Sequence, residues 1–312
     1  MNVFDSLSEV KKDKNTVVTI GTFDGIHLGH KKIIEKVIEK TSGYGGRNFV
    51  VTFDPHPRSV VSNGKDIKLL NTLEEKLNIL SDFGIQNTLV IKFTKEFSQL
   101  SSEEFFKKYI IDGIGIKEVV IGYDHHFGKG RGGDKNTLDE MGIEFNFNVT
   151  SVDAVSIDGT TVSSTKIRNA LNEGNVKQAS MLLGRYYSFS GKVIKGDQRG
   201  RLLGFPTANI KLDDENKLLP LIGIYAVEFI VNSQKHFGLM SIGKRPTFYN
   251  DGSVTTEVYI FDFNDDIYDK SVTVNLVDRI RGEEKYSSAE KLIEQMNKDK
   301  EAGLEIFSKL VS

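Results

Sequence analysis

The chain has 312 residues, of which 38% are hydrophobic and 27% charged, and its formal net charge is −2 at pH 7. This length favours two domains, and the small net charge argues against nucleic acid or an anionic membrane as a partner. The sequence contains no cysteine, which excludes disulfides, thiolate catalysis and cysteine-bound zinc. It shows no signal-peptide core and no run apolar enough to span a bilayer, so we expect a cytoplasmic protein with no membrane partner.

Apolar runs alternate with amphipathic helical patterns through the first half of the chain. Between residues 30 and 40, Ile33, Ile34, Val37 and Ile38 recur at helical spacing, with charged residues opposite them. The same reasoning predicts strands at 15–20, 48–53, 88–93 and 117–124, and helices at 30–40, 73–84 and 101–114. Strands separated by helices of this length predict a parallel α/β sheet covered by helices.

The pattern changes after about residue 185. Short strand-like runs separated by Gly, Asn and Asp turns occur at 188–196, 223–231, 236–243, 254–263 and 270–280, and a helical tail follows at 287–312. Strands without intervening helices favour an antiparallel barrel or sandwich. Residues 165–185 have the pattern of a helical connector, so we predict domains at 1–185 and 186–312.

The segment GTFDGIHLGH, residues 21–30, lies between the first predicted strand and the first predicted helix. Ligands of open α/β sheets gather at the carboxyl ends of strands, where helix N-termini favour anions. His27 and His30 are three residues apart and can share one face there. Two imidazoles beside backbone amides suit the negative charge that develops on a phosphate, so we predict an anion site.

Five of the six histidines fall in three loops that follow predicted strands: His27 and His30, then His56, then His125 and His126. If the strands are parallel, these loops share one edge of the sheet, and clustered titratable groups mark functional sites. A structural role for any single histidine, or a metal site made of histidines alone, is the alternative. No His-x-His or carboxylate–histidine spacing favours the metal.

Two further segments carry cations and hydroxyls. Residues 122–133, GYDHHFGKGRGG, have neither the glycine spacing nor the Ser or Thr of a P-loop, and we interpret them as a flexible basic loop or an exposed turn. Residues 162–171, VSSTKIRNAL, place three hydroxyls and two cations at a predicted helix start. One hydroxyl suffices for a helix cap, and cations are unfavourable at a helix N-terminus unless an anion joins them, which favours phosphate binding.

Together these motifs resemble a known family. GTFDGIHLGH resembles the H-x-G-H signature of nucleotidyltransferases, and with FDPHP, GYD-x-x-FG-x-x-R-x-G and VSST-x-IR the sequence is similar to bacterial FAD synthetases. The resemblance implies a Rossmann-like domain that transfers AMP from ATP to FMN. It implies His27, His30 and Arg168 as catalytic residues, and as nucleotide-binding residues Gly21, Phe23, Asp24, Gly29, His56, Asp124, Arg131, Ser163, Ser164 and Thr165. The attacking phosphate is already ionised, so the site must offset charge and align reactants rather than supply a strong base.

The second informative segment is residues 184–212, which contains the run PTAN. If Thr207 to Asn209 is extended, both polar side chains point to one side and Ala208 to the other. A hydroxyl and an amide oxygen are hard ligands that suit Mg²⁺ with phosphate. A turn in which both side chains satisfy backbone groups is the alternative. The cations Arg199 and Arg201, with glycines at 191, 196, 200 and 204, favour a mobile phosphate cover.

This half resembles the riboflavin kinases, through GR-x5-G-x-V-x2-G-x3-GR-x-LGFPTANI, PLIGIYAV, GKRPTF, TTEVYIFDF and RGEEKYSS. The resemblance implies a six-stranded barrel that transfers the ATP γ-phosphate to riboflavin. It implies that Gly196, Gly204, Thr207 and Asn209 bind MgATP, and that Glu257 accepts the proton of the riboflavin hydroxyl. An exposed strand carboxylate is the alternative reading of Glu257.

We therefore expect a bifunctional enzyme whose small-molecule substrates are ATP, riboflavin and FMN, whose product is FAD and whose metal is Mg²⁺. His125 and His126 stand where the first family usually has Phe and Arg, and Tyr259 and Asp269 where the second usually has His and Gly. The change at His125–His126 leaves a kinase with one activity as an alternative. A flavin-binding sensor or carrier without turnover is a second alternative, although binding alone would need no base.

Overall fold

A computed structural model describes residues 1–61, 67–196, 200, 203–244 and 254–311. The chain divides into two compact units, Met1–Ser163 and Ser164–Ser312, which we describe separately. Within the described ranges, no helix combines the length and the apolar character that crossing a membrane requires.

The first unit is built on a six-stranded sheet with the order β1-β4-β3-β2-β5-β6, and every pair in it is parallel. This confirms the predicted parallel α/β sheet, and adds two edge strands that the sequence analysis did not predict. The strands are β1 (Asn2–Phe4), β2 (Thr16–Ile20), β3 (Arg47–Asp54), β4 (Asn87–Lys92), β5 (Glu118–Gly122) and β6 (Asn148–Val152). A short hairpin, β7 (Ser156–Ile157) and β8 (Thr160–Thr161), follows the sheet.

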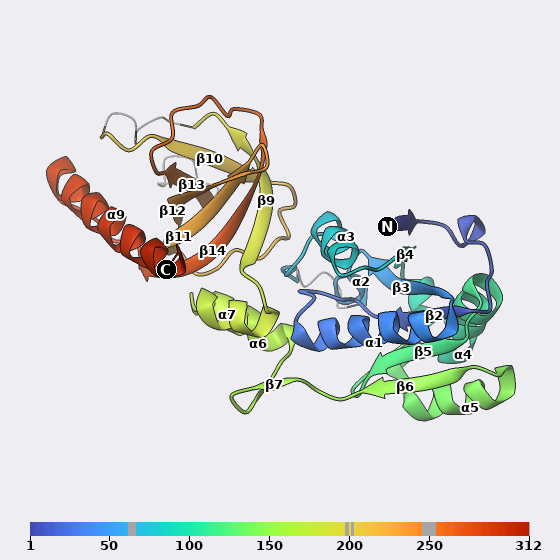
Figure 1. Cartoon of the computed structure of the whole chain (residues 1–312). Helices are drawn as coiled ribbons and strands as arrows, with labels where there is room; N and C mark the ends of the chain where they lie inside the picture. The colour runs from blue at the N-terminus through green and yellow to red at the C-terminus, as the bar shows by residue number, and fades with distance from the viewer. Residues whose placement is uncertain (62–66, 197–199, 201–202, 245–253, 312) are drawn as a thin grey trace. The chain divides into compact units, whose positions relative to one another are not determined.

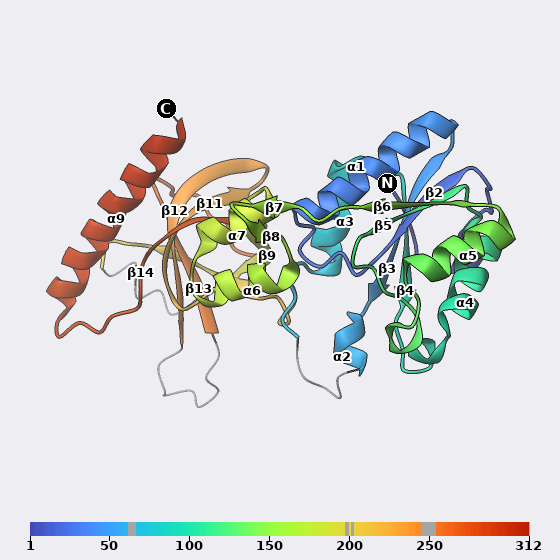
Figure 2. The same ribbon diagram turned by 90° about the horizontal axis from the view of Figure 1, so that it is seen from below.

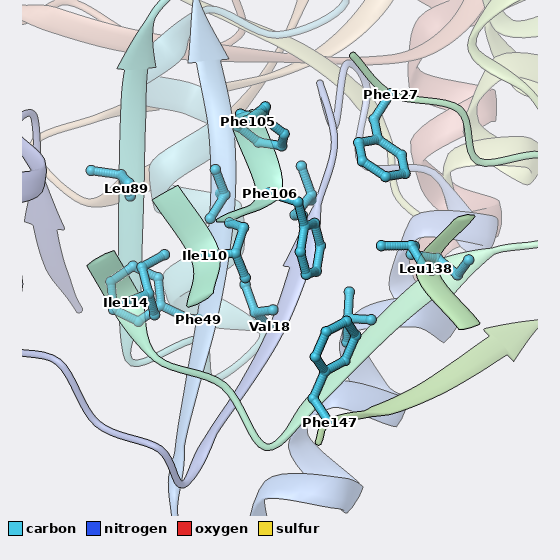
Figure 3. Close-up of a cluster of buried hydrophobic side chains, with 14 of the residues drawn as sticks. Val18, Phe49, Leu89, Phe105, Phe106, Ile110, Ile114, Phe127, Leu138 and Phe147 are labelled. Atoms are coloured by element: carbon cyan, nitrogen blue, oxygen red, sulfur yellow. The ribbon is translucent and has the colours of Figure 1, made fainter. Parts of the chain in front are cut away.

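Helices cover both faces of this sheet (Figure 1). The helical elements are α1 (Leu28–Tyr44), α2 (Pro57–Val61), α3 (Leu73–Asp82), α4 (Ser102–Phe105) with its π-helical continuation η3 (Phe106–Ile114), and α5 (Lys135–Phe145), besides short 3₁₀ turns. On one face α1 and α3 pack through Ile34, Val37 and Leu80. On the other, Phe106 and Ile110 of η3 and Leu138 of α5 pack on Val18 and Phe49 (Figure 3). Helices on both faces explain why β2 is buried at every position.

The second unit contains a closed barrel of six antiparallel strands in the order β10-β13-β12-β11-β14-β9, as the resemblance to riboflavin kinases implies. The strands are β9 (Tyr187–Ile194), β10 (Thr207–Leu212), β11 (Gly223–Val231), β12 (Gln234–Lys244), β13 (Val254–Ile260) and β14 (Ser271–Arg281). The C-terminal helix α9 (Ala289–Val311) packs along the outside of the barrel (Figure 2). Its buried Asp299 forms an ion pair with the partly exposed Arg281 of β14, with Nη2 and Oδ2 2.7 Å apart.

Two helices, α6 (Ser164–Asn172) and α7 (Val176–Leu183), group with the barrel rather than with the sheet. The amide of Leu221 donates to the carbonyl of Leu171 at the end of α6, and Lys177 of α7 pairs with Asp278 of β14. The compact units therefore meet at 163/164. The functional boundary predicted at 185/186 stays a prediction.

Candidate active sites

The turn between β2 and α1 holds the two histidines against each other. His27 is the N-cap of α1, and its Nδ1 accepts the backbone N–H of His30 at 3.4 Å. The two rings stack with centroids 3.8 Å apart and planes 13° from parallel. A Cβ on Gly29 would lie 3.2 Å from the His27 ring, so a glycine is favoured there. Because the first turn of α1 carries no acidic side chain, this helix start can receive an anion.

The three histidine-bearing loops follow β3, β2 and β5, which are neighbours in the sheet. Since these strands are parallel, the loops leave the same edge, as predicted. His56 begins the turn into α2, where its Nδ1 accepts the amide of Arg58 at 3.1 Å. Asp124 is exposed directly after β5.

The Nε2 atom of His125 is buried and has no hydrogen-bond partner in the described part of the chain. Its ring stacks on Phe127 with centroids 5.6 Å apart. Burial lowers the pKa of His125 to about 4, although the nearby carboxylate of Asp124 acts in the opposite direction. The imidazole is therefore neutral near pH 7 and contributes no charge to this edge of the sheet.

The glycine-rich loop after His126 is exposed over residues 128–132 and forms backbone hydrogen bonds at several points, and its flexibility stays a prediction. Phe127 and Gly133 exchange backbone hydrogen bonds, and the amide of Lys129 donates to the carbonyl of Leu100 at 2.9 Å. A Cβ on Gly128 would lie 2.5 Å from the Ser102 nitrogen. The loop thus packs against the start of α4, and Arg131 lies exposed on it.

The hydroxyl-rich motif spans the division between the units. Ser163 is the last residue of the first unit, while Ser164, Thr165 and Arg168 belong to α6 in the second. The helix was predicted to begin after the three hydroxyls, but it begins at Ser164, so Ser164 and Thr165 lie in its first turn. That Arg168 and the hydroxyls serve the same site as His27 and His30 stays a prediction.

The sequence analysis missed a buried lysine near the segment Thr22–His27, which leads from β2 into α1 and which we call the histidine turn. Lys76 of α3 is 6% exposed, and its Nζ donates to Thr52 Oγ1 at 3.3 Å. Burial lowers the pKa of Lys76, while Asp24 and Asp54 oppose this shift. Leu73, Lys76 and Leu80 lie at helical spacing, so the position of a lysine on the apolar stripe was the available signal. Asp24 is 3% exposed and accepts the backbone amides of Leu70 and Asn71.

The polar residues predicted for the barrel lie on one face of neighbouring strands. Asn209 of β10 is paired directly with Glu257 of β13, and Thr207 lies two residues before Asn209. The Thr207 hydroxyl donates to Glu257 Oε2 at 3.0 Å. The adjacent Val258 is fully buried, and burial alternates along β13, so Glu257 lies on the opposite face of the strand from Val258.

Glycine gives the Asn209 side chain its space. A Cβ on Gly196 would lie only 2.2 Å from Asn209 Nδ2. Gly200 lies close to the same region, since a Cβ there would be 3.4 Å from Thr207 Oγ1. Gly204 has a φ of 84°, in the left-handed region that favours glycine. Arg199 and Arg201, predicted to cover the phosphates, lie outside the described residues.

Comparison with known families matches one family to the N-terminal part of the chain and another to the C-terminal part. The FAD synthetase family matches residues 9–166, and the riboflavin kinase family matches residues 183–307. The first match contains the histidine turn and the loops at the sheet edge, and the second contains Thr207, Asn209 and Glu257. Residues 167–182, which form most of α6 and α7, lie between the two matches.

Individual relatives match over almost the whole chain. The bifunctional riboflavin kinase/FMN adenylyltransferase of Listeria monocytogenes is 40% identical over 299 residues, covering 96% of this chain and 94% of that protein. The protein of the same description from Bacillus subtilis is 37% identical, with 96% and 95% covered. A solved structure described as a macrolide-efflux protein from Streptococcus pneumoniae is similar with a TM-score of 0.88 and 32% identity, covering 96% of this chain and 97% of that one.

Proposed function

Because the chain belongs to the family of bifunctional riboflavin kinase/FMN adenylyltransferases, we propose that it makes FMN from riboflavin in the barrel and FAD from FMN in the sheet unit. The observation that carries the proposal is the hydrogen bond between Thr207 and Glu257, which joins a phosphate-binding segment to a candidate base. A binding protein without turnover would have no use for this base.

In the kinase reaction, Glu257 accepts the proton of the riboflavin 5′-hydroxyl as its oxygen attacks the γ-phosphorus of ATP. The bond from the γ-phosphorus to the bridging oxygen breaks, and ADP leaves. General bases of this kind contribute about 10²- to 10⁴-fold to rate. The register of β10 and β13 supports the assignment, since it fixes the carboxylate beside Thr207 and Asn209.

The donor set of the barrel suits Mg²⁺. Thr207 donates its only hydroxyl proton to Glu257, so the lone pairs of its oxygen stay available as ligands. Asn209 adds an amide oxygen on the same face, and oxygen donors are those that Mg²⁺ prefers. We propose that Thr207 and Asn209 hold the metal with ATP, where it would neutralise charge on the phosphates.

In the adenylyl transfer, a phosphate oxygen of FMN attacks the α-phosphorus of ATP, and pyrophosphate leaves as the bond to the bridging oxygen breaks. No strong base is needed, because the attacking oxygen carries no proton to remove. Since His27 Nδ1 accepts an N–H, the neutral ring carries its proton on Nε2 and can donate it to a phosphate oxygen. We assign charge stabilisation to His27, His30 and Arg168. The remaining residues named for the sheet unit would bind nucleotide or flavin.

The proposal includes a cytoplasmic location, which the absence of cysteine supports. An assay of the full chain with riboflavin, ATP and Mg²⁺ tests it, with the flavins separated by chromatography. We expect FMN to appear first and FAD to follow, whereas the variant His30→Ala should stop at FMN. Accumulation of FMN by the unaltered chain would select the single-activity kinase. Flavin binding without ATP consumption would select a sensor or carrier.

A further inference from the structure

The backbone of the histidine turn has an unfavourable conformation that contacts with neighbouring segments must stabilise. Phe23 has a φ of 47° and Ile26 a φ of 36°, and both side chains are almost fully buried. Positive φ is strained for residues of this kind, above all for β-branched isoleucine. Such conformations persist only when surrounding contacts hold them. The two strained residues flank Asp24 and lead directly into His27.

Among the described residues, contacts on two sides hold this turn. The carboxylate of Asp24 accepts the amides of Leu70, at 2.9 Å, and Asn71, at 3.2 Å, which joins the turn to the segment before α3. At the start of the turn, the Thr22 carbonyl accepts the Thr52 hydroxyl at 3.3 Å. That hydroxyl in turn accepts Lys76 Nζ. Each group therefore donates a hydrogen bond to the next: Lys76 donates to Thr52, and Thr52 donates to the Thr22 carbonyl at the start of the turn.

Lys76 also supplies the positive charge among these buried polar side chains. Among the described residues, the charged groups that act on the pKa of Lys76 are Asp24 of the turn and Asp54 of β3, both of which favour its protonated form. Glu75 precedes it on α3, where its carboxylate accepts the Thr72 amide in a capping box. A buried carboxylate such as Asp24 is unfavourable without a compensating charge, and Lys76 supplies one.

We propose that Lys76 is a positioning residue for adenylyl transfer, holding the Thr22–His27 turn in the conformation that stacks His27 on His30. The proposal rests on the role assigned above to these histidines. Lys76 is too deeply buried to act on substrate directly, so it acts through Thr52 and Asp24. Small displacements of a catalytic group at a distance from the chemistry cost as much as 10²-fold in rate.

The central test compares Lys76→Met, which keeps the stem and removes the charge, with Lys76→Arg, which keeps a charge and a donor. Both are assayed for FMN adenylylation well below their melting temperatures. We expect Lys76→Met to lower kcat by about 10- to 100-fold, with KM for ATP changing much less, and Lys76→Arg to restore part of the loss. The exposed Lys135→Met on α5 is the matched control and should leave kcat unchanged.

A pH profile separates this role from a purely structural one. Since burial lowers the pKa of Lys76, adenylylation should decline on the alkaline side, where Lys76 loses its proton, whereas riboflavin phosphorylation by the same chain should not share this decline. Lys76→Arg should remove the alkaline decline, because a guanidinium stays charged. If Lys76→Met does not fold, Thr52→Val tests the same chain of donors, with an expected loss of about tenfold in kcat.

Full kcat in folded Lys76→Met, or in Thr52→Val, would overturn the proposal. An alkaline decline that persists unchanged in Lys76→Arg would also overturn it. The variant His30→Ala distinguishes this failure from failure of the proposed function. If His30→Ala abolishes FAD formation while Lys76→Met does not, only the role of Lys76 is wrong. If the unaltered chain forms no FAD from FMN, the proposed function itself fails.

Discussion

Thr207 of β10 and Glu257 of β13 are joined across two neighbouring strands by a hydrogen bond of 3.0 Å from the hydroxyl to the carboxylate. The same ladder pairs Asn209 directly with Glu257. The barrel therefore fixes the relative position of the proposed base and of both proposed metal ligands through backbone register. A substitution in the barrel should therefore affect riboflavin phosphorylation without affecting FMN adenylylation.

Replacing Glu257 with Gln keeps the shape and removes the proton acceptor. We expect riboflavin phosphorylation to fall by about 10²- to 10⁴-fold, the range that a general base contributes. FAD formation from supplied FMN should continue, because it uses the other unit. The measurement is the initial rate of each step with purified variant. A wild-type rate of FMN formation would show that Glu257 is not the base.

Gly196→Ala tests the placement of Asn209. The new methyl group would lie 2.2 Å from Asn209 Nδ2 and 2.4 Å from its Cγ, so the amide must move. We expect KM for ATP in the kinase reaction to rise about tenfold, with little change in adenylylation. Gly282→Ala is the control, since its Cβ would meet only Arg279 Nη2 at 3.6 Å, an ordinary contact. Equal KM values in the two variants would contradict the assignment of Asn209.

The ion pair between Arg281 and the buried Asp299 predicts a stability effect in the barrel. Asp299 is 3% exposed, and Arg281 donates to it through Nε and Nη2. Asp299→Asn removes the negative charge that pairs with Arg281, and because the Arg281 side chain is 16% exposed, the cost should be less than that of breaking a fully buried pair, about 3–5 kcal/mol. Thermal unfolding monitored through kinase activity should show a large drop in melting temperature. Glu294→Gln, in an exposed pair on the same helix, should change it little, and equal effects would contradict this account.

His125 predicts a dependence of stability on pH in the sheet unit. Its pKa is about 4 in the folded chain, below the ordinary 6.5, so the unfolded chain binds more protons between these values. The stability that neutral His125 permits is complete above pH 6.5 and is lost as pH falls toward 4. The loss is at most about 1.4 kcal/mol per pH unit.

Hydrogen exchange at the amides of β2 and β3 measures this effect between pH 7 and pH 5. The variant His125→Phe carries no titrating group at this position, so its protection should fall less with acid than that of the unaltered chain. Identical acid sensitivity of the two proteins would show that His125 is not the group responsible.

Periodic patterns predicted the four inner strands of the sheet, because both faces of those strands are buried and the runs are apolar throughout. The edge strands escaped prediction for the opposite reason. β1 has only three residues, and β6 has one buried residue, Val152, so neither shows a clear period. Pairing with β4 and β5 determines their structure, and a single-strand pattern cannot reveal it.

The candidate sites show the same limit. The histidine stack and the face shared by Thr207, Asn209 and Glu257 follow from local spacing and strand alternation. The role of Lys76 does not, because it depends on contacts to Thr52 and on charges from Asp24 and Asp54, far away in sequence.

The central claim is that one chain carries out two chemically different transfers from ATP. The most direct test supplies riboflavin and ATP labelled either at the γ-phosphorus or at the α-phosphorus, and follows the label into FMN and FAD. The account predicts γ-label in FMN, and both the γ-derived and the α-derived phosphates in FAD. FAD made from unlabelled FMN should carry α-label only. FMN that carries γ-label with no α-label ever entering FAD would contradict the claim.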